Sequence, residues 1–219
     1  MSAVGRARWS ELWRGASARA DMRAWFDRLT TLYSQAHRHY HGIRHIEECL
    51  AEFDAARHLA EDHIAVELAI WFHDALYDPR ATDNEEQSAI LAEECLSEGG
   101  TSGHLRAAVT DLVLATKTHE VSGQVDAQLL VDVDLSILGK PEPRFLEYEA
   151  QIRGEYDWVP DIPFVTRRAE ILERFLARER IYTTEHFFRT YERQARSNLQ
   201  ASIGRLRGAI AGQPGSPPS

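Results

Sequence analysis

Three short segments carry side chains that can bind a metal ion or transfer a proton. Residues 40–45 read YHGIRH, and a helix there places His41 and His45, four residues apart, on one face. Two imidazoles on one face can bind one ion together, or one can bind while the other transfers a proton. Two unrelated histidines on a helix are the alternative interpretation of this spacing.

The other two segments place acidic residues in strongly apolar surroundings. His73 and Asp74 close the apolar helix that contains IAVELAIWF, and a buried carboxylate is costly unless it is paired or binds a metal. Asp132 and Asp134 lie within AQLLVDVDLSIL, where apolar residues again surround them. A carboxylate–histidine hydrogen bond, or an exposed helix end, is the alternative interpretation of His73 and Asp74.

The elements that must position these residues are predicted to be helices. Apolar residues recur at helical spacing along most of the chain, and glycine or proline separates the segments. Residues 127–138 alternate like a strand, but because no partner strand is evident we interpret them as a short helix that enters a turn at Gly139. We expect helices over residues 19–34, 43–58, 63–77, 85–97, 103–117, 127–138, 142–157, 162–179 and 184–209.

The fold class is therefore predicted to be all-α. We expect an N-terminal extension over residues 1–18, a single helical domain over 19–210 and a disordered tail over 211–219, where GQPGSPPS is rich in glycine, proline and serine. The chain has only two cysteines, which excludes a disulfide framework. It has neither an apolar leader segment nor a run of about 18 apolar residues, so we expect a cytoplasmic protein without a membrane span.

Charge is unevenly distributed over the 219 residues. The formal net charge is −9, with +5 over residues 1–44, −18 over residues 45–179 and +4 over residues 180–219. An acidic chain is a poor binder of duplex nucleic acid, because such binding neutralises phosphates. Carboxylates together with imidazoles suit a divalent metal ion, and they equally suit solvated helix faces.

The order of the candidate residues resembles a known family. His45, then His73 with Asp74, then Asp134 is similar to the H…HD…D ligand order of the HD-domain metal-dependent phosphohydrolase superfamily. The stretches YHGIRHI, WFHDALYD, DNEEQSA, ATKTH, DVDLSILG, YEAQIRGEY and ERQARSNL resemble a bacterial subgroup of predicted HD phosphohydrolases of undetermined substrate. The resemblance implies an HD-domain-like helical bundle with these four residues as metal ligands, and Asp132 is the competing choice for the last one.

The resemblance also implies roles for residues near those ligands. Cyclic-nucleotide phosphodiesterases share the fold, and their similar Tyr-His-Asn-x-x-His segment makes His41 the general acid, although Gly42 stands here in place of the asparagine. Asp78 takes the place of an acid that lies near the attacking water in alarmone-degrading HD enzymes, although Tyr77 replaces the glutamate before it. His119 corresponds to a histidine that holds a second ion in two-metal members, and a plain helix-end histidine is the alternative.

Three further residues are candidate substrate contacts. Lys117 is one of two lysines among 25 basic residues, and this rarity makes it a candidate phosphate contact. Arg153 can bind a phosphate through two parallel hydrogen bonds, and Tyr156 can stack on a base. A surface lysine, a surface arginine and a core aromatic residue are the corresponding alternatives.

These inferences predict a divalent-metal-dependent phosphohydrolase that acts on a nucleotide or other small phosphoester by metal-activated water. Asp74 holds the metal and helps to orient the water in this hypothesis. Mn, Fe, Co, Ni, Mg and Zn are all candidate ions. A di-iron HD-fold oxygenase and a non-catalytic nucleotide-binding signalling module are the alternative functions. We expect neither duplex nucleic acid nor a membrane as partner, and the oligomeric state stays open.

Overall fold

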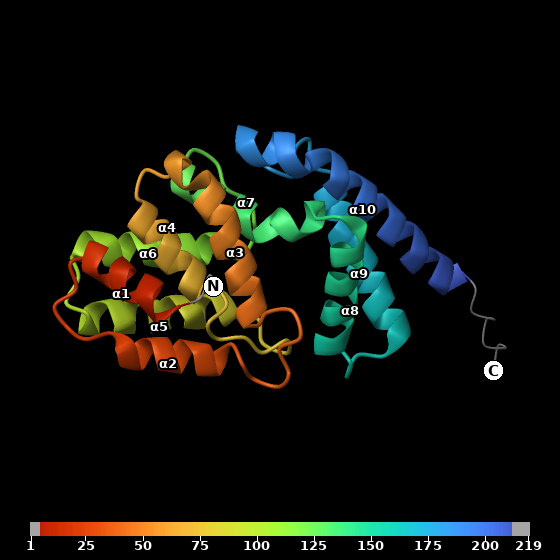
Figure 1. Cartoon of the computed structure of the whole chain (residues 1–219). Coiled ribbons are helices and arrows are strands. Elements are labelled where there is room, and N and C mark those ends of the chain that lie inside the picture. Colours follow the sequence, from red (N-terminus) through yellow and green to blue (C-terminus); the bar gives the residue numbers. More distant parts are fainter. Residues whose placement is uncertain (1–4, 212–219) are drawn as a thin grey trace. The chain divides into compact units, whose positions relative to one another are not determined.

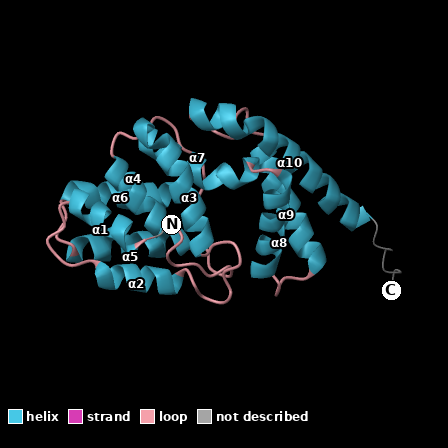
Figure 2. Cartoon of the chain, in the orientation of Figure 1, coloured by secondary structure: helices cyan, strands magenta, loops and turns pink. Residues whose placement is uncertain are grey.

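The computed structural model of the chain describes residues 5–211, and every regular element in that range is a helix (Figure 2). The predicted all-α fold class is confirmed. The elements in chain order are α1 (Arg6–Gly15), α2 (Arg23–Leu32), α3 (Ile43–Ala56), the 3₁₀ helix η1 (Arg57–Leu59), α4 (His63–Phe72), α5 (Asn84–Glu98), α6 (Gly103–Ala115), α7 (Val125–Asp134), the 3₁₀ helix η2 (Leu135–Gly139), α8 (Glu142–Glu155), α9 (Asp161–Leu176) and α10 (Glu185–Ala211).

The alternating stretch near residue 131 folds as helix α7 followed by η2, as predicted. Val131, Asp132 and Val133 are all buried, so the alternation does not mark a face that is open to water. The helix expected over 63–77 ends earlier, at Phe72, whereas α3 begins at Ile43, as the range 43–58 predicted. His41 therefore lies before α3 and does not share a helix face with His45.

The chain divides after Asp134 into two compact units, Met1–Asp134 and Leu135–Ser219. The sequence predicted a single domain over 19–210, and the division falls inside that range. The segment expected as an extension, residues 1–18, contains α1, which is part of the first unit. Of the tail predicted to be disordered, residues 212–219 lie outside the described residues, and Ala211 is the last residue of α10.

Helix α4 is the central element of the first unit. Every residue from Ala65 to Phe72 is buried, and α4 packs against α1, α3, α5, α6 and α7 (Figure 1). The Asp62 carboxylate caps its first turn by accepting hydrogen bonds from the backbone N–H groups of Ile64 and Ala65, both at 3.0 Å. A rigid, apolar helix therefore carries the His73–Asp74 pair at its C-terminal end.

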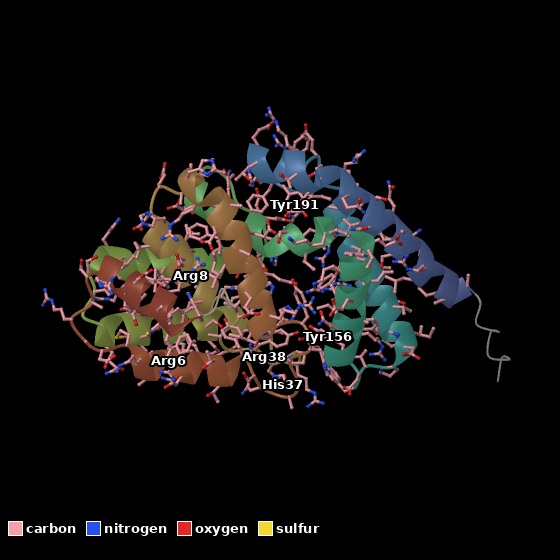
Figure 3. All side chains as sticks on the ribbon, viewed as in Figure 1. Arg6, Arg8, His37, Arg38, Tyr156 and Tyr191 are labelled. Carbon is pink, nitrogen blue, oxygen red and sulfur yellow. The ribbon has the colours of Figure 1, made fainter. Side chains whose placement is uncertain are left out.

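Helix α1 is part of the core of this unit. The Trp9 ring packs edge-on against Trp71 of α4 with 5.1 Å between centroids, and its indole N–H donates to the Met22 carbonyl at 2.7 Å. Arg8 also reaches α4, where its Nε lies 2.7 Å from an oxygen of the buried Glu67 carboxylate (Figure 3). Residues expected to be peripheral thus help to fix the central helix.

The second unit is built from η2, α8, α9 and α10. Helix α10 packs against α9 and η2, and α8 packs against η2. The Asn198 side-chain amide on α10 donates to the carbonyls of Leu138 and Lys140, both at 2.8 Å, which fixes the end of η2. Gly139 has no room for a side chain, because an added Cβ would lie 2.5 Å from Cβ of Tyr191.

None of the helices in residues 5–211 combines the length and the apolar composition that crossing a membrane requires.

Candidate metal centre

Four side chains predicted to be metal ligands come together in the first unit. His45 lies on the first turn of α3, His73 directly follows α4, Asp74 comes next, and Asp134 is the last residue of α7. The Nε2 atoms of His45 and His73 are 3.0 Å apart. His45 Nε2 also lies 3.2 Å from Oδ1 of Asp134 and 3.5 Å from Oδ2 of Asp74. Three helix ends therefore converge on one point.

The His73 imidazole is held in one orientation. Its Nδ1 lies 3.0 Å from the carbonyl oxygen of Ile70, one turn earlier on α4. A carbonyl can only accept, so Nδ1 carries the hydrogen and Nε2 is left to take up a proton or bind an ion. That Nε2 lies 3.2 Å from Oδ2 of Asp74 and 3.6 Å from Oδ1 of Asp134.

Cys49 lies one turn after His45 on α3 and contacts its ring. The sulfur is 3.6 Å from Nδ1 and 3.7 Å from Nε2 of His45. Because it is nearly equidistant from the two nitrogens, it lies beside the ring and away from the direction in which Nε2 binds an ion. Burial, and after it the carboxylates of Asp134 and Asp74, raises the pKa of the Cys49 thiol well above its usual value. Cys49 therefore packs beside the centre as a neutral thiol.

Asp134 uses both carboxylate oxygens. Oδ1 faces His45 and His73, while Oδ2 lies 2.8 Å from Nε2 of His119. The His119 backbone has a φ of 51°, a left-handed conformation that few side-chain-bearing residues adopt and that is frequent at functional sites. Asp132 is fully buried, and a residue two positions earlier on a helix points to nearly the opposite side. Of the two candidate acids, Asp134 faces the cluster.

Burial leaves one side of the cluster open. His45 and His73 are 2% exposed, whereas the side chains of Asp74, Asp134 and His119 are 16%, 15% and 26% exposed. The imidazoles thus form the floor of the centre, and the carboxylates with His119 form its accessible side. The exposed part of the cluster is therefore the side with the carboxylates and His119.

The electrostatics of the cluster favour a positive charge at its middle. Burial alone raises the pKa of a carboxyl group and lowers that of an imidazole. Here mutual attraction outweighs burial, because nearby imidazoles, His73 foremost, hold the pKa of Asp74 well below its usual value. Hydrogen bonds from His119 and other imidazoles lower the pKa of Asp134 in the same way. Asp74 and Asp134 in turn raise the pKa of His73 well above its usual value.

His41 lies beside the cluster, although not where the sequence predicted. It was expected on the same helix as His45, but it lies in the turn before α3, because the helix begins only after Gly42. Its ring is 6.1 Å from that of His45 between centroids and stacks on Tyr77 at 4.2 Å. Its charge is also among the influences that lower the pKa of Asp74. A turn, and not a shared helix face, brings His41 to the centre.

The structure gives Asp78 and Lys117 local partners in and around the loop between α4 and α5. Asp78 is exposed, and its Oδ1 accepts a hydrogen bond from the backbone N–H of Arg80 at 2.9 Å. Lys117 is exposed as well, and its ammonium group pairs with Glu86 and donates to the Thr82 carbonyl. Neither belongs to the group of donor atoms around His45.

The remaining two candidate substrate contacts, Arg153 and Tyr156, lie in the second unit; Tyr156 is labelled in Figure 3. The Arg153 guanidinium donates to the carbonyls of Tyr156 and Val159 and to the Asp161 carboxylate, at 2.5, 3.1 and 2.8 Å. It thereby links the end of α8 to the start of α9. The Tyr156 ring stacks beside Trp158 with 6.3 Å between centroids.

One residue beside the centre was not found from the sequence. Arg38, in the histidine-rich segment before α3, is only 8% exposed, and its guanidinium donates to the carbonyls of His41, Asp74 and Ala75. Backbone carbonyls leave no trace in side-chain patterns, so nothing in the spacing pointed to these contacts. The only available signal was an arginine beside residues that were already candidates.

The donor set fits a divalent ion. His45, His73 and Asp74 each offer a ligand atom within 4.8 Å of the others, and so do His45, Cys49 and Asp134. Ligands held about 2.1 Å from one ion at tetrahedral or octahedral angles lie about 3.0–3.4 Å apart. The separations between His45 Nε2 and its three nitrogen and oxygen neighbours span 3.0–3.5 Å. Two imidazole nitrogens with two carboxylate oxygens suit Mn, Fe, Co, Ni or Zn.

No protein-family model, curated protein or solved structure matches the chain. The chemistry of the centre is therefore inferred from its donor atoms, their spacing and their burial.

Proposed function

We propose that the chain is a divalent-metal-dependent phosphohydrolase of the HD-domain type. One observation carries the proposal: the two buried Nε2 atoms of His45 and His73 face each other at 3.0 Å, with carboxylate oxygens of Asp74 and Asp134 beside them. Two imidazole lone pairs repel each other at this distance unless a proton or a cation lies between them. The two carboxylates compensate the charge of a cation at that point.

In this proposal His45, His73, Asp74 and Asp134 hold the ion. A bound divalent ion supplies Lewis-acid chemistry, which lowers the pKa of water to about 7 and offsets the charge of a phosphate group. The chain keeps the donors in place: the Ile70 carbonyl fixes the His73 ring, and the apolar helix α4 fixes its position. Outer partners of this kind orient ligands and raise their basicity.

His41 is the proposed proton donor to the leaving oxygen. Its imidazole is close enough to Asp74 to lower the pKa of that carboxyl group, and its ring stacks on Tyr77. Transfer of a proton by a positioned imidazole contributes about 10²–10⁴-fold to a rate. The position in a turn leaves His41 outside the donor set, which suits a residue that must release its proton.

The proposed substrate class, a nucleotide or another small phosphoester, comes from the resemblance of the motif order to HD phosphohydrolases. The acidic first unit would repel a phosphate group on its own, so the ion is needed to bring the substrate to the carboxylate side. Lys117 stays a candidate contact for the substrate, while Arg153 and Tyr156, in the second unit, stay predictions from the sequence alone.

A di-iron oxygenase is the second candidate function. The observation that favours it is Asp134, whose Oδ1 faces His45 and whose Oδ2 contacts His119, as in a carboxylate that bridges two ions. The same arrangement is compatible with a two-metal hydrolase. Oxygen uptake by the iron-loaded protein separates the two, because a hydrolase that holds the same ion releases phosphate without consuming oxygen.

The decisive experiment begins with elemental analysis of protein purified without chelators. Metal-free protein is then reloaded with Mn, Fe, Co, Ni, Mg or Zn and assayed against phosphomonoesters and phosphodiesters, with His73→Ala as the inactive control. We expect bound metal and metal-dependent phosphate release that the control lacks. Oxygen uptake by the anaerobically purified iron form would favour the oxygenase. Nucleotide binding without turnover under every metal would favour a signalling module.

A further inference from the structure

Arg38 is a buried charged side chain next to the proposed centre, and it is labelled in Figure 3. Its Nη1 donates to the carbonyls of His41 at 3.0 Å and Asp74 at 2.6 Å, and its Nη2 donates to that of Ala75 at 2.9 Å. Its Nε donates to the side-chain oxygen of Gln35 at 3.1 Å. One terminal nitrogen thus bridges two segments that are more than thirty residues apart in the chain.

The surroundings suit a guanidinium group. The group lies near the rings of Tyr33 and Tyr77, with its carbon 5.2 and 5.6 Å from their centroids. Arginine offers five N–H donors in a rigid plane, whereas lysine offers a compact point charge on a flexible stem. The carbonyls of Asp74 and Ala75 follow the C-terminal end of α4, where a cation interacts favourably with the helix dipole.

We propose that Arg38 is a positioning residue of the centre. By joining the backbone at His41 to the backbone at Asp74, it sets the distance between the proposed proton donor and a proposed metal ligand. This inference rests on the proposed function for the roles of those two residues. The hydrogen bonds from Arg38 to the backbone carbonyls of His41 and Asp74 are observed, whatever roles those two residues have.

Other contacts show that the segment before α3 is built to a fixed geometry. The Tyr33 hydroxyl donates to the Trp71 carbonyl at 3.0 Å, and the backbone N–H of Ile43 donates to the Tyr33 carbonyl at 3.2 Å. Gly42 allows this close approach, because an added Cβ would lie 3.2 Å from the Tyr33 carbonyl oxygen. These bonds anchor the ends of the segment, and Arg38 anchors the part that carries His41.

The test uses the full chain and the variants Arg38→Ala and Arg38→Lys. The lysine variant keeps the charge and the aliphatic stem, so it carries the test if the alanine variant does not fold. His39→Gln is the matched control, because His39 is an exposed neighbour in the same turn. Circular dichroism establishes that each variant is folded.

Two measurements separate positioning from general stabilisation. In metal-free protein at one pH, the imidazole ¹⁵N–¹H signals of His41 report its surroundings. In a titration with Co²⁺ alone, the dissociation constant and the visible absorption spectrum report the donor set. We expect shifted His41 signals and Co²⁺ binding weaker by about 10- to 100-fold in Arg38→Lys, the range found for residues that orient metal ligands. The control is expected to match the wild type.

Chemical rescue of Arg38→Ala tests whether the guanidinium group itself is needed for Co²⁺ binding. Millimolar guanidinium ion is expected to restore Co²⁺ binding to Arg38→Ala, while methylammonium is not. Wild-type His41 signals together with wild-type Co²⁺ affinity in the folded Arg38→Lys variant would overturn the inference. Absence of Co²⁺ binding by the wild-type protein would overturn the proposed metal function instead, and the His41 signals would then decide the role of Arg38 alone.

Discussion

The Nδ1–H group of His73 donates to the backbone carbonyl of Ile70 at 3.0 Å, and this one bond determines how the imidazole can act. It commits the proton to Nδ1 and directs Nε2 at His45, Asp74 and Asp134. The His73 ring is thus oriented before an ion binds, because its partner, the Ile70 carbonyl, is part of the backbone of α4.

Removing either member of the His73–Asp74 pair is expected to abolish metal binding. His73→Ala and Asp74→Ala each delete one donor and leave the other charges of a buried cluster uncompensated. Helical structure is expected to persist, since α4 ends at Phe72. Elemental analysis and circular dichroism measure the two effects. His63→Ala is the matched control, because His63 is an exposed residue at the other end of α4. Full metal occupancy in both variants would contradict the assignment.

Metal affinity is expected to fall as the pH is lowered. The carboxylates of Asp74 and Asp134 raise the pKa of His73 well above its usual value, so in the metal-free protein His73 carries a proton that an ion must displace. Affinity then falls about tenfold for each pH unit below that pKa. Calorimetric titration with Co²⁺ in two buffers of different ionisation enthalpy measures the proton release, expected to be about one per ion. An affinity that does not change with pH would rule this out.

His41→Gln is expected to retain the metal and to lose rate. His41 lies outside the donor set but beside Asp74, so its loss removes proton transfer, a factor of about 10²–10⁴ in kcat. Metal content and kcat for the best phosphoester measure the two properties separately. Tyr77→Phe is the control, because the ring that stacks on His41 is kept. Loss of metal from His41→Gln would make His41 a ligand instead.

Trp9→Ala is expected to destabilise the chain by about 3–5 kcal/mol, as is typical of truncating a buried tryptophan. Trp9 is 1% exposed and contacts Trp71 of the central helix. Urea unfolding followed by tryptophan fluorescence and circular dichroism measures the change. Arg6→Ala on the exposed side of the same helix is the control and is expected to change stability little. A small effect of Trp9→Ala would mean that α1 is peripheral after all.

Most of the helical framework could be predicted from apolar periodicity. Helices α2 to α10 each overlap a predicted range, and the ambiguous residues 127–138 were assigned correctly. Helix α1 was missed because residues 1–18 contain three arginines and no continuous apolar run. The apolar stripe formed by Trp9, Leu12 and Trp13, at spacings of three and four, was nevertheless present.

The candidate centre was predictable in part. The motif order identified His45, His73, Asp74 and Asp134, which the structure brings together, and local spacing could not separate Asp132 from Asp134. The helix ends near the centre could be predicted only in part. The helix α3 begins after Gly42 and leaves His41 in the preceding turn, and α4 ends before Asp74. Arg38 donates to backbone carbonyls of other residues, and Ile70 accepts through its own carbonyl. Patterns of side chains in a sequence do not reveal contacts of this kind.

Both cysteines of the chain, Cys49 and Cys95, are buried, and burial foremost raises the pKa of each thiol. Thiolate is the form that reacts with alkylating agents and peroxide, so both side chains are expected to be chemically inert in the folded protein. The two native cysteines are therefore not expected to interfere with site-specific labelling of the protein. A single cysteine introduced at an exposed position could carry a fluorophore or spin label without prior replacement of the two native ones.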